Sequence, residues 1–379
     1  MFLDYLEDGI PSGGNLATVR FAKLLKKRGH NVIFLTAKMP GKSREGRYNR
    51  IKTYRLSSIP FLKKQNVYII VPNPKKLKEI FEKEKIDVLD IMVPTPGAVA
   101  SMKIAKSLGI RVVSHSFGQP ENVLLCHGNL RNKNLDNLFY KYLAYAYKKS
   151  DITICPSKFA EMEIKKYARK LNIITISCGV DFSKFKKTNS TQFLKKYGIP
   201  KKSKKILFVG RLHNEKNISL LINAMPKIIE RVKDTHLCIV GSGKLSEHLE
   251  KEADILGIKS NVTFLGKIPE EDIPLAYNCC DFFALPSLAE LEGIVVLEAM
   301  ACGKPILVAK SRASAARFFV QENGFLFSPH SPNDFADKAI KLLENEPMRK
   351  NMALKSLEQV QDYDINKSVE MLEKVYNSN

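Results

Sequence analysis

Residues 282–300 read FFALPSLAELEGIVVLEAM, and the fold expected for the whole chain follows from this stretch. The apolar run Phe282–Leu285 predicts a short strand, and a helix is predicted to begin near Gly293 and to run to Met300. The first N–H groups of such a helix have no partners, and its positive dipole end attracts anions. Because glycine has no side chain, Gly293 would let a phosphate or a sugar approach closely. The stretch therefore predicts a strand, a turn with an anion site, and a helix.

Two carboxylates flank the predicted helix start: Glu290 lies before it and Glu298 lies on the helix. A carboxylate only accepts hydrogen bonds, so it suits the paired hydroxyls of a sugar or a ribose. The alternative is structural, with Glu290 as an acid near a helix N-terminus and Glu298 as a solvated helix side chain. The segment taken alone leaves both interpretations open.

The same alternation of short β-branched runs and amphipathic helical stretches continues through both halves of the chain. Strands that alternate with helices favour parallel, doubly wound sheets, so the expected fold class is α/β with two Rossmann-like domains. Strands are predicted at 32–36, 88–91, 111–115, 152–155, 173–177, 206–209, 237–240, 262–264, 282–285 and 305–308, and helices at 16–28, 218–232, 244–256 and 333–343.

The Lys-rich segment 184–205 predicts a linker between the two domains. The N-terminal domain is then expected over 1–182 and the C-terminal domain over 203–360. Residues 361–379 are predicted to contain a C-terminal helix that packs back on the N-terminal domain.

Ligands of doubly wound sheets bind beyond the carboxyl ends of the strands, and the informative motifs do follow predicted strands. The run Phe208–Leu212 (FVGRL) ends one strand with Gly210 and Arg211, and Lys216 comes shortly after. Glycine allows close approach of the backbone, and two cations suit a diphosphate. A surface turn flanked by two basic residues would look the same. Another strand ends in a Gly-Ser-Gly run that begins at Gly241, which alone marks no more than a tight turn.

Taken in order, these motifs resemble the retaining glycosyltransferases of family 4, which have the GT-B fold of two Rossmann-like domains facing a cleft. The family's E-x7-E signature is matched by Ser287, Glu290, Gly293, Glu298–Gly303 and Pro305. Further matches run along nearly the whole chain: Gly13-Gly14, the RGHNV run at 28–32, His115, Asp151–Ser157, Gly179–Phe185, Phe208–Arg211 with Lys216, Val240–Gly243, Phe264–Gly266 and Asn323-Gly324.

The resemblance implies a role for each matching residue. Arg211 and Lys216 would bind the donor diphosphate and stabilise the departing charge, Glu298 would hold the ribose, and Glu290 would hold the donor sugar. His115 would face the sugar from the N-terminal domain. The implied catalytic residues are His115, Glu290, Arg211 and Lys216; the implied donor-binding residues are Gly13, Gly14, Gly210, Arg211, Lys216, Gly241, Lys267, Ile268, Glu290, Gly293, Ile294, Val295 and Glu298. No metal ligand and no cofactor is implied, because the nucleotide-sugar is a co-substrate.

The sequence departs from the family pattern in three places. Glu292 stands where the family often has an aromatic residue or Gln, which leaves the sugar preference open. The first strand, normally a longer apolar run, is reduced to Met1–Tyr5. Asp362-Tyr363-Asp364 imitates the metal-binding DxD of a different glycosyltransferase fold, but it follows no predicted strand, so we interpret it as a solvated loop.

The net charge of +22 lies entirely in the first half of the chain. Residues 1–200 hold 37 basic and 15 acidic residues, whereas residues 201–379 hold 24 of each. A one-sided basic field suits a membrane leaflet, a nucleic acid or a phosphorylated substrate; the alternative is a Lys-rich composition that fills exposed helix faces. Two stretches, 59–64 and 138–149, mix Lys with Tyr, Phe and Leu as interfacial segments do, although the second could equally be a core helix.

We therefore expect a hexosyltransferase that uses a nucleotide-sugar, most simply a UDP-sugar, and a membrane lipid such as diacylglycerol as acceptor. A soluble or polysaccharide acceptor and a GT-B nucleotide-sugar epimerase are the alternatives. Nucleic acid is not an expected partner, because no stacking motif or binding module is present. The seven scattered cysteines, the lack of a signal sequence and the lack of an apolar run of about 18 residues predict a cytoplasmic enzyme, peripheral at the inner face of the membrane.

Overall fold

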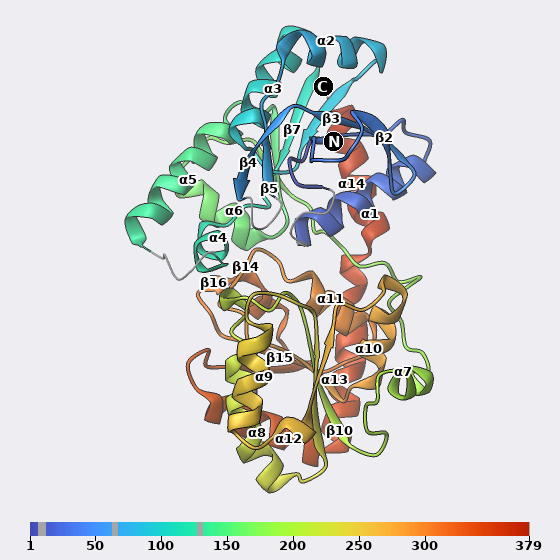
Figure 1. Cartoon of the computed structure of the whole chain (residues 1–379), viewed down its shortest axis with the longest axis vertical. Coiled ribbons are helices and arrows are strands. Elements are labelled where there is room, and N and C mark those ends of the chain that lie inside the picture. The colour runs from blue at the N-terminus through green and yellow to red at the C-terminus, as the bar shows by residue number, and fades with distance from the viewer. Residues whose placement is uncertain (7–12, 63–66, 127–131, 379) are drawn as a thin grey trace. The chain divides into compact units, whose positions relative to one another are not determined.

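A computed structural model of the chain describes residues 1–6, 13–62, 67–126 and 132–378 (Figure 1). Lys63 and Lys64, which belong to one of the two basic stretches, lie outside these residues. The chain divides into two compact units. Unit 1 comprises Met1–Pro120, Asn132–Cys178 and Asn366–Asn379, and unit 2 comprises Glu121–Arg131 and Gly179–Ile365.

Unit 2 is built on a six-stranded parallel sheet with the order β12-β11-β10-β13-β15-β17. The strands are apolar almost throughout because helices cover both faces of the sheet. Figure 1 shows α8, α9 and α12 on one side and α10, α11 and α13 on the other. The bounds are β10 Lys204–Val209, β11 Thr235–Val240, β12 Val262–Gly266, β13 Phe282–Leu285, β15 Ile306–Ala309, β17 Gly324–Phe327, α8 Ser219–Arg231, α9 Ser246–Ile255, α10 Ile273–Cys279, α11 Ile294–Ala301, α12 Pro332–Glu344 and α13 Glu346–Gln359.

The strand order of this sheet reverses between β10 and β13. From β10 the chain moves outward through β11 and β12, and from β13 it moves the other way through β15 and β17. The two strands at the reversal are direct neighbours, with Ile206 opposite Phe282 and Leu207 opposite Phe283. Ligands of open α/β sheets bind at such a switch point, beyond the carboxyl ends of the strands.

The segment expected to be a linker, 184–205, belongs to the body of unit 2. It contains helix α7 (Thr191–Lys196), and the side chains of Phe185 and Phe193 are each 2% exposed within the core. Full burial of one such ring stabilises the fold by about 2–3 kcal/mol. These two aromatic residues therefore anchor the segment in unit 2, although the lysines around them predict an exposed linker.

Unit 1 carries a second largely parallel sheet. Phe2 forms parallel bridges to Ile91 and to Leu35, so the short N-terminal segment joins β1 to β6 in the middle of the sheet. The strands on one side of Phe2 are ordered β1-β3-β2 and on the other β6-β7-β8-β9. Their bounds are β1 Ile33–Ala37, β2 Glu45–Tyr48, β3 Ile51–Leu56, β6 Val88–Ile91, β7 Arg111–His115, β8 Ile152–Cys155 and β9 Ile173–Thr175, and a hairpin is formed by β4 Ser58–Leu62 and β5 Val67–Ile70.

The helices of unit 1 include a segment from the far end of the chain. Helix α14 (Ile365–Asn377) lies against this unit, where Glu373 accepts from the Arg28 Nε at 3.0 Å and contacts His30 Nε2 at 2.8 Å. The RGH run is thus a docking point for α14. The other helices are α1 Gly13–Lys27, α2 Pro74–Lys83, α3 Pro96–Ser107, α5 Lys133–Tyr147 and α6 Lys158–Lys165, whereas α4 Pro120–Cys126 belongs to unit 2 from Glu121 onward.

The expected fold class, α/β with two Rossmann-like doubly wound units, is confirmed. Strands β6, β7, β8 and β13 have the predicted bounds. The antiparallel β2 was not predicted, because its mostly exposed residues EGRY carry no apolar pattern.

Candidate functional site

The carboxyl ends of β10, β11 and β12 in unit 2 meet at a glycine-lined edge. The Gly210 N–H donates to the Val240 carbonyl at 3.0 Å, and the Gly241 N–H donates to the Gly266 carbonyl at 2.8 Å. Gly241 has a φ of 133°, and a Cβ at this position would lie 1.8 Å from the Gly210 carbonyl oxygen. Close approach of one strand end to the next therefore requires glycine at position 241.

Arg211 follows Gly210 directly and is held by a buried acid. Its Nη2 donates to Glu215 Oε1 at 3.0 Å and to Asn122 Oδ1 at 3.3 Å. The Glu215 side chain is fully buried, and this burial raises the pKa of its carboxyl while the Arg211 and Lys216 charges oppose the rise. The Arg211 guanidinium is thus paired with an ionisable carboxyl group, that of Glu215.

Lys216 pairs with Glu290, which brings together two residues from opposite sides of the strand-order reversal. The Lys216 Nζ lies 2.5 Å from Glu290 Oε1, and each side chain is 11% exposed. Glu290, which precedes the helix start as predicted, belongs to the two-residue strand β14 (Ala289–Glu290), which pairs with β16 (Ala313–Ser314). An ion pair screened from water by its surroundings is stronger than one on the surface.

Helix α11 begins at Ile294, directly after Gly293, as the sequence predicts. Gly293 has a φ of 101°, and a Cβ there would lie 2.9 Å from the Ala316 Cβ. Both the backbone conformation and the packing therefore require glycine at this helix start. The N–H groups of Ile294 and Val295 lie in the first turn of the helix, where a helix leaves its donors without partners in the same helix.

Glu298 is buried within α11, so the alternative of a solvated helix side chain is wrong. It is 3% exposed and accepts a hydrogen bond from the Tyr277 hydroxyl at 2.9 Å. Tyr277 in α10 is itself fully buried, with ring contacts to Phe185 and Phe283. A packed tyrosine therefore fixes the orientation of this carboxylate.

Three buried oxygens at this end of the sheet lack hydrogen-bond partners within the described residues: Glu215 Oε2, Ser287 Oγ and Ser314 Oγ. Buried polar groups are nearly always satisfied in native proteins, so such a group points to an unseen partner such as a ligand or water. The expected base contacts, Lys267 and Ile268, follow β12 at the same edge, with Lys267 exposed and Ile268 buried.

Three of the expected site residues belong to unit 1. Gly13 and Gly14 open helix α1 rather than preceding it, and a Cβ on Gly14 would lie 3.2 Å from the Phe117 side chain. His115 ends β7, is 1% exposed, and has its ring 5.0 Å from the Phe117 ring. Within unit 1, Phe117 therefore contacts both the helix start and the histidine.

The structure adds residues that sequence reasoning missed. Glu215 could have been suspected, because an acid beside Lys216 and near Arg211 is placed to neutralise them. No pattern in the sequence indicates the hydroxyl of Tyr277 or the amide of Asn122, because their partners are distant along the chain.

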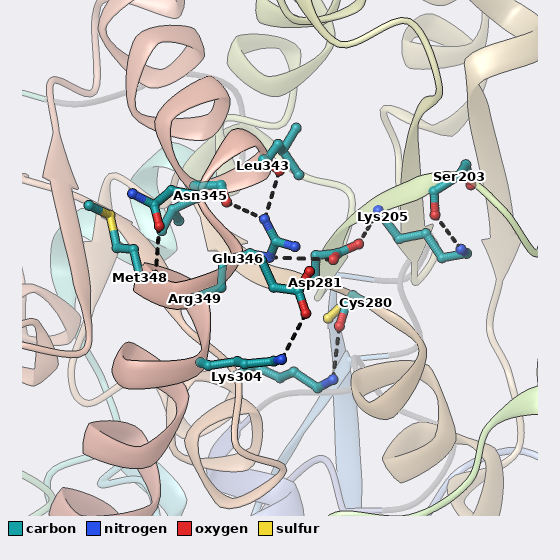
Figure 2. Close-up of polar contacts among 12 residues, drawn as sticks. Ser203, Lys205, Cys280, Asp281, Lys304, Leu343, Asn345, Glu346, Met348 and Arg349 are labelled. Atoms are coloured by element: carbon teal, nitrogen blue, oxygen red, sulfur yellow. Dashed lines mark hydrogen bonds and ion pairs between the residues drawn. The ribbon is translucent and has the colours of Figure 1, made fainter.

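The amino ends of the same strands are also rich in charge, but the partners differ (Figure 2). Lys205 Nζ donates to the Lys201 and Ser203 carbonyls, and Lys304 Nζ donates to the Cys280 carbonyl at 2.8 Å. Figure 2 also shows Arg349, which donates to the Leu342 and Leu343 carbonyls at 2.5 and 2.7 Å and lies 3.5 Å from Asp281. These cations satisfy main-chain groups and hold the helices to the sheet.

Neither a metal cluster nor a membrane-spanning helix is found in the part of the chain that the structure describes. No group of three or more His, Cys, Asp or Glu side chains is placed there to hold a metal ion. The described helices also include none with the length and apolar character needed to cross a bilayer.

Comparison with known proteins places this geometry in a family. Residues 11–184 match the family described as Glycosyltransferase Family 4, and residues 189–359 match the family described as glycosyl transferases group 1. An alpha-monoglucosyldiacylglycerol synthase of Streptococcus pneumoniae is 26% identical over 75% of this chain, and the match spans 64% of that relative's length. An N-acetyl-alpha-D-glucosaminyl L-malate synthase of Bacillus anthracis is 24% identical over 96% of this chain and 93% of its own length.

Among solved structures, HepE of Anabaena in complex with UDP and glucose superimposes with a TM-score of 0.79 at 19% identity, over 100% of this chain and 99% of that one. The fold shared with such structures is GT-B. With both of its halves matched by glycosyltransferase families, the chain belongs to glycosyltransferase family 4 and is a glycosyltransferase with the GT-B fold.

Proposed function

We propose that this glycosyltransferase transfers a hexose from a UDP-sugar to an acceptor hydroxyl with retention of the anomeric configuration. The observation that carries the proposal is the ion pair between Lys216 and Glu290 at the strand-order reversal of unit 2, with Arg211 just beyond β10 and Glu298 buried on α11. This is the place where an open α/β sheet binds its ligand. The Anabaena neighbour solved with UDP and glucose supports the choice of donor.

The charges at this site suit a diphosphate. Arg211 and Lys216 are each paired with a single acid, Glu215 and Glu290. A diphosphate would draw both cations toward its oxygens, and Glu290 would then accept from the hydroxyls of the donor sugar. As the sugar–phosphate bond breaks, negative charge grows on the departing diphosphate, and the two fixed cations with the N–H groups of Gly293, Ile294 and Val295 would stabilise it.

The ribose and the base would be held deeper in unit 2. Tyr277 donates to one oxygen of Glu298, which leaves the carboxylate oriented to accept from paired ribose hydroxyls. The backbone around Lys267 and Ile268, beyond β12, would contact the base. In unit 1, His115 would contact the donor sugar, while Gly13 and Gly14 would approach the phosphate at the start of α1.

We propose a membrane lipid as the acceptor, because an outward face of α5 has the composition of an interfacial helix. Leu135, Leu138 and Tyr145 are spaced by three and seven residues, so they share one side of the helix, and they are 45%, 65% and 50% exposed. Lys141 on the same helix is exposed, and Lys149 lies 4.9 Å from the Tyr145 ring centroid. Lys beside exposed apolar side chains suits an anionic bilayer surface.

A second exposed apolar group lies on the β4–β5 hairpin of unit 1. Ile59 is 57% exposed and Phe61 is 65% exposed. Each basic residue near an anionic surface contributes about 1 kcal/mol, so a few suffice for reversible docking. The diacylglycerol synthase relative supports a lipid acceptor, and we place the enzyme at the cytoplasmic face of the membrane.

A soluble acceptor is the second candidate. It is favoured by the malate synthase relative, whose match covers more of both chains than that of the diacylglycerol synthase. A small hydroxy acid would need no membrane contact, so the two candidates differ in the part played by the α5 face.

One screen separates these possibilities. UDP-glucose, UDP-galactose and UDP-N-acetylglucosamine are each incubated with diacylglycerol in anionic vesicles, with L-malate, and with no acceptor. The proposal expects a glycolipid product, with vesicle binding that weakens as salt rises and in a Leu138→Glu variant. A glycosylated malate alone would replace the lipid by the soluble acceptor. A new sugar epimer formed from the donor alone, or no turnover of any donor, would contradict transfer.

A further inference from the structure

We propose that Asp90 and Tyr376 are positioning residues that fix the orientation and the tautomer of His115. This inference rests on the proposed contact between His115 and the donor sugar. It extends the site of unit 1 to a residue of the last helix, α14, far from His115 along the chain.

The sheet of unit 1 places Asp90 and His115 on the same face. Asp90 on β6 is opposite Val113 on β7, and His115 lies two residues beyond Val113. Side chains two residues apart on a strand point to the same side, so the carboxylate and the imidazole are diagonal neighbours. Their side chains are 3% and 1% exposed, which keeps water away from the pair.

The two side chains lie within hydrogen-bonding distance of each other. His115 Nε2 lies 3.0 Å from Asp90 Oδ1, although the angle between them falls outside that of a regular hydrogen bond. A small rotation of the imidazole would align the two groups, because the last torsion of histidine is soft. The other ring nitrogen, Nδ1, has no hydrogen-bond partner within the described residues.

A residue of helix α14, Tyr376, holds the Asp90 carboxylate in place. The Tyr376 hydroxyl donates to Asp90 Oδ2 at 2.6 Å, so it occupies the carboxylate oxygen that does not face His115. Burial raises the pKa of Tyr376 well above its ordinary value, as do the Asp90 charge and this hydrogen bond, so the phenol stays protonated as a donor. The tyrosine thereby keeps the carboxylate turned toward the imidazole.

The Asp90 carboxylate determines which nitrogen of the His115 ring carries the proton. An ionised carboxylate only accepts hydrogen bonds, so it favours the proton on Nε2 and leaves a lone pair on Nδ1. Such a nitrogen accepts from a hydroxyl of the donor sugar. The ring is also held by aromatic neighbours, with its centroid 6.4 Å from that of Phe21 and 5.0 Å from that of Phe117. Rotation away from Asp90 is therefore restricted by packing as well as by charge.

The test is a double-mutant cycle on UDP release from UDP-glucose, in the presence of the best acceptor found by the screen. Asp90→Asn should lower kcat by about tenfold or more with KM changed less than about twofold, because the amide no longer specifies the Nε2–H tautomer. In a His115→Ala background the same change should have almost no further effect, because Asp90 acts through His115. An equal loss in both backgrounds would overturn the inference.

Tyr376→Phe is the milder variant, and it keeps the ring packed. It should lower kcat by about threefold to tenfold, the effect of one lost hydrogen bond to a charged group. The matched control is Tyr54→Phe, which also removes a hydroxyl donating to a carboxylate of unit 1, that of Glu84 at 2.5 Å, and should leave kcat unchanged. Equal rates for the two Tyr→Phe variants would count against the role of Tyr376.

A spectroscopic measurement separates this inference from the proposed function. In protein labelled with nitrogen-15 histidine, the His115 ring should show the Nε2–H tautomer, assigned by loss of its signals in His115→Ala. Asp90→Asn should shift the ring toward a mixture of tautomers. That shift supports the positioning role even if no donor is turned over, a result that would contradict only the proposed function. An unchanged tautomer in Asp90→Asn would overturn the positioning role whatever the activity.

Discussion

Both ends of the unit 2 sheet carry buried or half-buried cations, but the partners of these cations differ. At the amino ends, Lys205, Lys304 and Arg349 donate to main-chain carbonyls (Figure 2). At the carboxyl ends, Arg211 donates to side-chain oxygens and Lys216 to a carboxylate. A cation that satisfies the backbone cannot leave without exposing an orphaned carbonyl, whereas one paired with an acid can exchange that partner for an anionic ligand.

The two ends show how a structural charge can be told from a functional one when neither is freely exposed. Burial and the number of hydrogen bonds do not separate the two ends, since Lys205 is 4% exposed and the Lys216 side chain is 11% exposed. The kind of partner does: Lys205, Lys304 and Arg349 all donate to main-chain carbonyls, Arg349 with the Asp281 carboxylate in addition, whereas the hydrogen bonds of Arg211 and Lys216 go to side chains. Glycines with backbone conformations that other residues rarely adopt also mark the carboxyl end, at Gly241 and Gly293.

The largest expected effect is the loss of catalysis at the carboxyl end. Lys216→Gln should lower kcat for UDP release by about 100-fold to 1000-fold, as does removal of one group that stabilises charge in the transition state. The matched change at the other end of the comparison is Lys205→Gln, on β10 itself. Steady-state kinetics on both variants, corrected for the folded fraction, should show a near-normal kcat for Lys205→Gln. Similar losses of kcat in the two variants would show that the cations at the two ends of the sheet do not differ in function.

The converse prediction concerns stability at the amino end. Arg349→Met should lower the free energy of unfolding by about 2–4 kcal/mol, because the Leu342 and Leu343 carbonyls and the Asp281 carboxylate lose a buried partner. Urea unfolding measures this, and UDP-glucose affinity should be unchanged in the folded protein. Arg231→Met is the control: its arginine is 68% exposed, so the loss should be under about 0.5 kcal/mol. Equal losses would mean that Arg349 has no special structural role.

A smaller effect is expected in the pH dependence of stability. His236, the second residue of β11, is buried, and burial together with the nearby Lys205 charge lowers its pKa to about 4. The neutral ring is thus favoured in the folded state, so its contribution is present above the unfolded pKa of about 6.5 and is lost as pH falls through about 4.

Full desolvation would make this contribution about 3 kcal/mol, and partial solvation lowers it to about 2 kcal/mol. His236→Gln should therefore flatten the fall in unfolding free energy between pH 6.5 and pH 4, measured by urea unfolding across that range. If the unfolding free energy of His236→Gln falls as steeply over this pH range as that of the wild type, other groups govern the fall.

The smallest expected effect concerns the hydrogen bond from Tyr277 that orients the Glu298 carboxylate. Tyr277→Phe removes the hydroxyl but keeps the ring packed, so UDP-glucose affinity should fall by about threefold to tenfold, roughly 1 kcal/mol. Tyr197→Phe is the control in the same unit, because its hydroxyl donates to Asp272 at 2.6 Å, a carboxylate that is not part of the proposed site. Calorimetric titration should show a normal affinity for the control. A normal affinity in both variants would mean that Glu298 needs no positioning by Tyr277.

Much of this arrangement could be predicted from the sequence, because it rests on local patterns. The helix start at Gly293 and strand β13 follow from one short stretch, and Arg211 and Lys216 follow from another. The rest depends on residues far apart along the chain. The approach of Tyr277 to Glu298, of Lys216 to Glu290 and of Tyr376 to Asp90 is decided by packing of whole elements, which no local pattern encodes.

We propose that the carboxyl end of the unit 2 sheet binds the nucleotide-sugar. Calorimetric titration of UDP-glucose into the wild type, Glu298→Ala and Glu358→Ala tests it most directly, since Glu298 is buried in the proposed site and Glu358 is an exposed acid of α13. We predict an affinity about tenfold to 100-fold weaker for Glu298→Ala, an unchanged affinity for Glu358→Ala, and the same fold in all three by circular dichroism. Equal UDP-glucose affinity in the folded wild type and Glu298→Ala would contradict donor binding at the carboxyl end of the unit 2 sheet.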